Sequence, residues 1–123
     1  MNVHDVIKIY SSDTGYDKMK NYVNTVKNDE DRRVDSLIQD SPTDSKELLR
    51  VKKILRKMFS IIDQGVFLRD HEKRKSFFDT AWFQNNTLRY ENFYLELQKY
   101  PSYFEFCSKN GITVPQYLGN ALA

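Results

Sequence analysis

Four basic side chains near the middle of the chain are spaced so that they share one side of a helix. Separated by four, three and four positions, they are Lys46, Arg50, Lys53 and Lys57. Because a helix turns once in about 3.6 residues, this spacing places all four cations on one face. Clustered ammonium and guanidinium groups bind phosphates and carboxylates. The four residues therefore have two interpretations, a solvated helix face or a surface for an anionic partner, and the second is the functional hypothesis to test.

A second basic group follows in the next part of the chain. It consists of Arg69, Lys73, Arg74 and Lys75, with His71 among them. Residues 45–76 carry ten basic and four acidic side chains, whereas the whole chain has a net charge of only +2. The sequence leaves open whether the two groups are adjacent in space. If they are, residues 46–75 form one basic surface for an acidic protein or for nucleic acid.

Residue types that support catalysis or bind metals are sparse. His4 and His71 lie far apart in the sequence, and neither belongs to a nucleophile or metal-binding motif. Asp70 and Glu72 flank His71, but neighbouring helical positions point about 100° apart and cannot converge on one ion. Cys107 is the single cysteine and is expected to be a small core residue. We therefore predict no catalytic residues, no metal site, no cofactor and no enzymatic activity.

The helix that positions the first basic group is predicted from its apolar face. Asp44 and Glu47 have the spacing of a capping box, and Gly65 is a typical residue for ending a helix. Between them the apolar residues recur every three or four positions. They are Leu48, Val51, Leu55, Met58 and Ile62, widened by Ile54, Phe59 and Ile61. We expect this helix, about 45–64, to be the centre of the fold.

Shorter elements are predicted before and after this helix in the sequence. Residues 3–10 form an amphipathic helical turn or a strand. Apolar spacing over 16–26 resumes at Val34, Leu37 and Ile38, which predicts either one long helix or, as we favour, two helices with a break or bend near Asn28. A turn is expected at 40–45 because Pro42 disfavours helix at the preceding residue. A helix capped by Asp70 is expected after the central helix. It should stop at the pair Asn85 and Asn86, before a helix from Thr87 to Tyr100 that is closed by Pro101.

Two short helices, about 103–109 and 114–122, are predicted at the C-terminal end. Capping boxes begin at Ser102 and Thr113, and Asn110-Gly111 stops the first helix. The pair loosely resembles a helix-turn-helix unit over about twenty residues. Its second helix has no Arg or Lys with which to read DNA. A capped helical hairpin that packs on the core is therefore the favoured interpretation.

Length and composition complete the prediction of the fold class. The chain has 123 residues, 14% aromatic residues, four glycines and three prolines. This length suits one domain, and the few turn-forming residues argue against an all-β fold. We predict an all-α protein, a single compact bundle of about five to seven helices over residues 1–123. Neighbouring aromatic pairs, Phe77 with Phe78 and Trp82 with Phe83, exceed what one core needs and favour a homodimer.

The composition also narrows the function. One cysteine, no secretory segment and no apolar run of about 20 residues indicate a cytoplasmic protein without a membrane partner. Many Asn, Lys, Phe, Tyr and Ile residues are typical of AT-rich coding sequences, as in many phages and low-GC bacteria. We predict a non-enzymatic protein that binds another protein as an adaptor, assembly factor or regulator. The alternatives are a nucleic-acid-binding protein and a virion structural or scaffolding protein.

Overall fold

The computed structural model describes residues 28–71 and 76–123, and the regular elements in this part of the chain are all helical. In chain order they are α3 (Asp29–Leu37), α4 (Lys46–His71), the 3-10 helix η1 (Phe77–Asp79), α5 (Ala81–Leu97), α6 (Pro101–Asn110) and α7 (Leu118–Leu122). The predicted all-α class is thus confirmed. The segments predicted at 3–10 and 16–26 lie outside the described residues.

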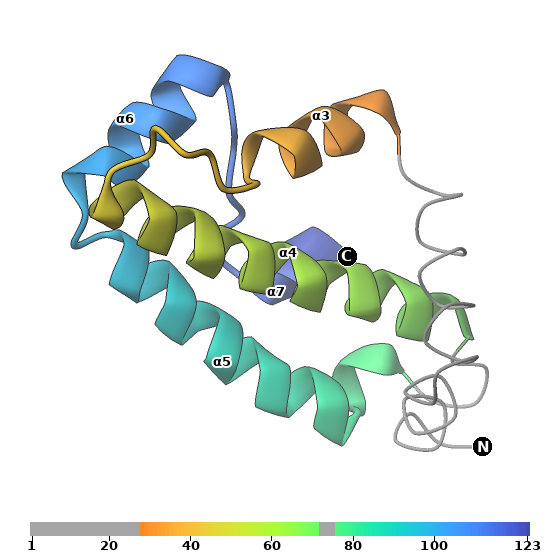
Figure 1. Ribbon diagram of the computed structural model, residues 1–123. Helices are drawn as coiled ribbons and strands as arrows, with labels where there is room; N and C mark the ends of the chain where they lie inside the picture. Colours follow the sequence, from red (N-terminus) through yellow and green to blue (C-terminus); the bar gives the residue numbers. More distant parts are fainter. Residues whose placement is uncertain (1–27, 72–75) are drawn as a thin grey trace.

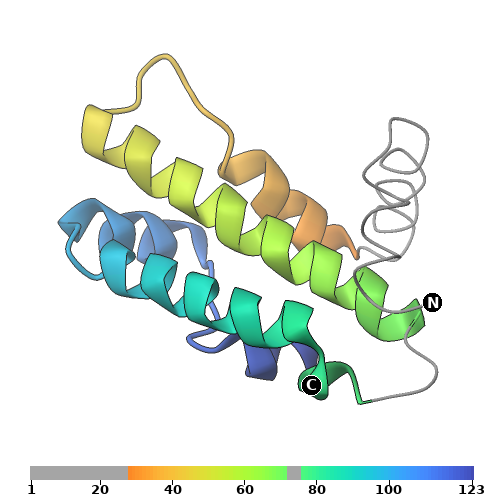
Figure 2. The ribbon, with the colours of Figure 1, turned by 90° about the horizontal axis from the view of Figure 1, so that it is seen from below.

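Helix α4 is the long helix on which α5, α6 and α7 pack. Helix α5 runs antiparallel beside it in both views of the ribbon (Figures 1 and 2). Helix α7 packs against both α4 and α5, and α6 contacts the first half of α4. The residues that seal this arrangement are fully buried. They are Val51, Leu55 and Met58 of α4, Tyr90 and Leu97 of α5, and Leu118 and Leu122 of α7. The predicted apolar face of the central helix therefore forms the core.

Helix α4 does not end at Gly65, as the sequence suggested, but continues to His71. Gly65 is buried, and a Cβ atom at this position would lie 2.5 Å from Cδ1 of Leu122 and 3.1 Å from Cη2 of Trp82. The glycine lets α7 and Trp82 approach the helix backbone. Phe67 and Leu68 follow it and are each only 2% exposed. Their burial outweighs the cost of about 1 kcal/mol that a glycine imposes on a helix interior.

The N-terminal cap of α4 is one residue later than predicted. The backbone N–H of Leu48 donates to Oγ of Ser45 at 3.1 Å, so Ser45 is the capping residue. Asp44 instead accepts hydrogen bonds from the backbone of Ser41 at 2.9 Å and from Nζ of Lys52 at 2.7 Å. The expected turn at 40–45 is therefore confirmed, whereas the capping box is wrong.

Lys52 is a charged residue on the inner side of α4. Its side chain is 7% exposed, and Nζ pairs with Asp44 and also donates to the carbonyl oxygen of Gln39 at 3.0 Å. The ammonium lies 5.6 Å from the ring centroid of Phe106 in α6. The hydrogen bond from Lys52 lowers the pKa of Asp44 below its ordinary value of 3.8. Lys52 thereby fastens the connection between α3 and α4 to the body of the protein.

The predicted boundaries near residues 70–86 are wrong. Asp70 belongs to the last turn of α4, and Thr80 is the N-cap of α5, accepting from the backbone of Phe83 at 3.2 Å. Asn85 and Asn86 lie inside α5, where the amide of Asn86 donates to the carbonyl oxygen of Trp82 at 2.8 Å. An asparagine that bonds to its own helix does not interrupt it, and the buried Trp82 anchors this part of α5 to the core.

The first predicted C-terminal helix, about 103–109, is confirmed as α6 (Pro101–Asn110), whereas the second is shorter than the predicted 114–122, at Leu118–Leu122. Gly111 ends α6 in a left-handed conformation with a φ of 63°, and the predicted capping boxes at Ser102 and Thr113 are both absent from the described structure. Helix α6 begins at Pro101 without a side-chain cap. Residues 112–115 are not helical, and the hydroxyl of Tyr90 donates to the carbonyl oxygen of Pro115 at 2.5 Å, which connects this segment to α5.

Helix α7 is therefore too short and too buried to read DNA. It has five residues, and its two leucines at 118 and 122 have no exposed surface. A recognition helix has to present one side to the major groove. The resemblance to a helix-turn-helix unit is thus superficial, and α7 instead packs its two leucines into the core.

Replacing Gly65 with alanine should destabilise the protein even though alanine is the better helix former. The added methyl group would push Leu122 out of its site on α4. Gly119 is the matched control, because a Cβ there would meet Cζ of Phe83 at an ordinary 3.6 Å. We expect the urea midpoint to fall for Gly65→Ala and to stay or rise for Gly119→Ala. A higher midpoint for Gly65→Ala would contradict the close packing of α7.

The Lys52–Asp44 pair predicts a pH-dependent stability. Because the pKa of Asp44 is lower in the folded than in the unfolded state, the pair stabilises the fold fully above pH 3.8 and loses this effect as the pH falls through the folded-state value. Lys52→Met should therefore lower the melting temperature strongly near neutral pH and less below pH 3.8. Lys53→Met, at an exposed neighbouring position, is the control. An equal loss for Lys52→Met at all pH values would exclude this role.

Candidate anion-binding groove

A shallow groove of about 370 Å³ opens on the outer side of α4, where that helix meets α5. We call it the basic groove. The residues that line it are Lys53, Arg56, Lys57, Ser60, Ile61 and Gln64 of α4 and Arg89 of α5. Four of these seven side chains are cationic and none is acidic. The groove therefore has the charge and the shape to receive an anionic group.

The helical period of α4 explains why these side chains face outward. Lys53 and Lys57 lie two residues before and after Leu55, which places each of them about 200° around the helix from that fully buried side chain. Ser60 and Gln64 continue the same side one and two turns later. Burial of the apolar face therefore fixes the outward direction of the polar face.

Helix α5 contributes a guanidinium and an aromatic ring. The Cζ atom of Arg89 lies 5.5 Å from the ring centroid of Phe93, one turn along α5. Nζ of Lys57 lies 5.7 Å from the same centroid. Both separations are within the range of cation–π attraction. The half-buried ring of Phe93 thus contacts two groove cations that come from different helices.

Three of the four cations lack a carboxylate partner. Arg56 pairs with Asp40 at 2.7 Å and donates to the carbonyl oxygen of Ile38 at 2.8 Å. Lys53, Lys57 and Arg89, by contrast, form no ion pair within residues 28–71 and 76–123. All three side chains are exposed. An incoming anion would therefore not have to displace an internal carboxylate.

The structure separates the first predicted basic group into two parts. Lys53 and Lys57 line the groove, whereas Lys46 is exposed in the first turn of α4 and is not among the lining residues. Arg50 pairs with Glu96 of α5 at 2.5 Å and donates to the hydroxyl of Tyr100 at 2.7 Å. The positive charge of Arg50 is thus already paired within the protein.

The second predicted basic group does not extend the groove within the described residues. Arg69 follows Lys53 by sixteen positions in α4, which corresponds to about 24 Å along the helix and about 160° around it. Its guanidinium donates to the carbonyl oxygen of Leu122 at 3.0 Å and contacts Asp70 at 3.4 Å. Arg69 therefore caps the C-terminal helix. Lys73, Arg74 and Lys75 lie outside the described residues.

Two cations of the groove were missed by the sequence prediction. Arg56 directly precedes Lys57, but the two positions lie about 100° apart around α4. Arg56 therefore does not share the predicted basic face of Lys46, Arg50, Lys53 and Lys57. Arg89 lies on another helix, and nothing in its local sequence shows that it approaches Lys57. The one local signal is the spacing of Arg89 and Phe93, which is typical of a cation–π pair on a helix.

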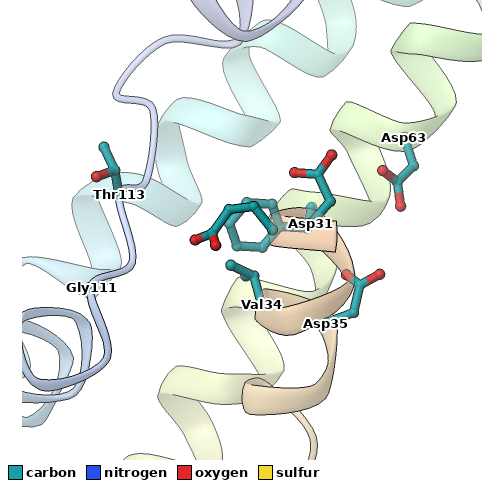
Figure 3. Close-up of a pocket in the computed structure, with 8 residues that line it drawn as sticks. Asp31, Val34, Asp35, Asp63, Gly111 and Thr113 are labelled. Carbon is teal, nitrogen blue, oxygen red and sulfur yellow. The ribbon is translucent and has the colours of Figure 1, made fainter. Parts of the chain in front are cut away.

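A second cavity, of about 300 Å³, lies on the α3 side of α4 and has the opposite charge. Figure 3 shows Asp31 and Asp35 of α3 and Asp63 of α4 around it, with Gly111 and Thr113 on the facing loop. Nowhere in the described part of the chain do three or more His, Cys, Asp or Glu side chains group closely enough to hold a metal ion. Acidic and basic surfaces thus flank the same helix.

The single cysteine has the properties of a structural residue. Cys107 is half-buried in α6, and burial raises the pKa of its thiol to about 11. At neutral pH the sulfur is therefore protonated, and a thiol in this state is a poor nucleophile.

No protein family, curated protein or solved structure matches this chain. Over residues 28–71 and 76–123, no helix is both long enough and apolar enough to cross a membrane.

The different surroundings of Arg50 and Lys53 predict different effects of charge reversal. Arg50→Glu would place a carboxylate against Glu96, so the melting temperature should fall. Lys53→Glu removes a cation from a cation-rich groove and should leave the melting temperature near that of the parent. Thermal unfolding followed by circular dichroism measures both. Equal losses in the two variants would show that the Arg50–Glu96 pair is not formed.

Proposed function

We propose that this protein is a non-enzymatic binding protein that captures an acidic segment of a partner protein in the basic groove. The observation that carries the proposal is the convergence of Lys53, Lys57 and Arg89, which have no carboxylate partner in the described structure. Exposed cations held near one another attract an anionic partner and orient it during encounter.

The dimensions of the groove favour a short protein segment over nucleic acid. From Lys53 to Gln64 the groove follows α4 for about 17 Å. Arg56 lines the groove but is paired with Asp40, and Arg50, one turn before the groove, is paired with Glu96. Non-specific binding to single strands commonly uses exposed aromatic faces on which bases stack. The ring of Phe93 is instead engaged by Lys57 and Arg89.

Nucleic-acid binding is the second candidate because the same three cations could neutralise phosphates. If they contacted duplex DNA, the slope of log affinity against log salt should be near −2.7, since each neutralised phosphate contributes about −0.9. A role as a virion structural or scaffolding protein and the formation of a homodimer stay predictions.

The proposal predicts that reversing two charges of the groove abolishes binding of acidic peptides. The test variant is Lys53→Glu with Lys57→Glu, and the control is Lys99→Glu with Lys109→Glu, which changes the net charge equally at exposed positions outside the groove. A fluorescent glutamate-rich peptide and a fluorescent single-stranded oligonucleotide serve as probes. Fluorescence anisotropy should show peptide binding to wild type and control, weakened at least about tenfold in the groove variant.

Two results would contradict the proposal. Equal peptide affinities for the groove variant and the control would show that the groove is not the binding surface. Binding of the oligonucleotide without binding of the peptide would favour the nucleic-acid alternative. Capture from the source cell, with half of each sample treated with nuclease, extends the test to natural partners, because a protein partner should survive the treatment.

A further inference from the structure

We infer that the acidic segment is recognised through a phosphorylated side chain, a phosphoserine or phosphothreonine, that is bound by Lys57, Arg89 and Lys53. This inference rests on the proposed function and specifies the ligand of the same groove. The three side chains bring three positive charges to a site that has no acidic lining residue. A carboxylate supplies one negative charge, whereas a phosphate monoester supplies about 1.5 to 2 at neutral pH and three acceptor oxygens.

The arrangement of two of these cations favours a compact, multiply charged anion. Lys57 and Arg89 come from antiparallel helices, yet both charges lie within 6 Å of the centroid of the Phe93 ring. Contact with the ring restrains both long side chains, so less conformational entropy is lost when an anion binds to them. A guanidinium and an ammonium together can donate hydrogen bonds to different oxygens of one phosphate.

Neutral donors complete the groove. Ser60 and Gln64 line it next to the cations, and the amide of Gln64 lies 3.5 Å from the hydroxyl of Ser60. At this distance the contact between them is weak, so both groups can turn toward a ligand. A phosphate has enough oxygen atoms to accept from such donors as well as from the cations. A single carboxylate has two oxygens and would leave part of this set unused.

The groove also explains why a phosphorylated peptide is favoured over a nucleic-acid strand. A strand presents one charge per phosphodiester, spread along its backbone, and would need a row of unpaired cations. Along α4 that row is interrupted, because Arg50 is paired with Glu96 and Arg56 with Asp40. The unpaired charges are concentrated around Lys57 and Arg89, which suits one dianion better than several monoanions.

The test compares three versions of one short glutamate- and glycine-rich peptide, with serine, glutamate or phosphoserine at the central position. Anisotropy titrations use wild type, Arg89→Lys, Arg89→Ala and the control Lys99→Ala. The phosphoserine peptide should bind wild type about tenfold or more tightly than the glutamate peptide. Arg89→Ala should remove most of this preference, Arg89→Lys should retain part of it, and Lys99→Ala should leave it unchanged. Arg89 and Lys99 are both exposed, so the variants are expected to fold.

Lowering the pH provides a second readout that depends on the phosphate itself. Its second pKa is near 6, whereas the glutamates of the probe remain ionised down to about pH 4.3. Lysine and arginine are the charged groups in the groove, and no histidine or carboxylate lines it. Between pH 7.5 and 5.5 the affinity for the phosphoserine peptide should therefore fall, while that for the glutamate peptide should stay constant.

The outcomes separate this inference from the proposed function. Equal affinity for the phosphoserine and glutamate peptides, with both lost in the Lys53→Glu, Lys57→Glu variant, would overturn the inference and leave the proposed function standing. Failure of all three peptides to bind wild type would overturn both. Binding of an oligothymidylate more tightly than the phosphoserine peptide would likewise overturn both and favour nucleic acid.

Discussion

Burial of one face of α4 is the constraint on which the rest of this structure depends. Val51, Leu55 and Met58 are fully buried because α5, α6 and α7 all pack on this helix. A helix of 26 residues with one side committed to the core must turn the opposite side to solvent. The direction of Lys53 and Lys57 is therefore set by the core, and the antiparallel course of α5 adds Arg89 to them. The periodicity of α4 thus places its apolar residues in the core and its groove cations on the opposite side.

Lys52 is the exception that joins the turn before α4 to the same core. It lies next to Lys53 in sequence, yet its ammonium points inward, where Asp44 and the carbonyl oxygen of Gln39 satisfy it. A buried cation is tolerated when an opposite charge and further acceptors surround it. Because its ammonium is buried against Asp44, Lys52 does not contribute to a binding surface. The two adjacent lysines thus have different roles: Lys52 holds the connection between α3 and α4, and Lys53 lines the groove.

The sequence predicted the features that depend on regular spacing and missed those that depend on contacts between helices. Apolar residues every three or four positions identified α4 and the outward direction of Lys53 and Lys57. Local signals at Gly65, Asn85 and Asn86 failed as helix ends, because each is worth about 1 kcal/mol and the burial of Phe67, Leu68 and Trp82 outweighs it. The pairing of Arg50 with Glu96 and the contact of Lys57 with the Phe93 ring that Arg89 also contacts are set by how α5 packs on α4. No local pattern encodes that packing.

The central claim is that anions bind on the outer side of α4 and not on its α3 side. Backbone amide chemical shifts of the ¹⁵N-labelled protein, recorded during titration with the glutamate-rich peptide, test it most directly. We expect the shifted signals to cluster at residues 53–64 and around Arg89, while those of residues lining the acidic cavity, such as Asp31, Asp35 and Thr113, do not move. Shifts concentrated on α3 or α6, with residues 53–64 unaffected at saturation, would contradict it.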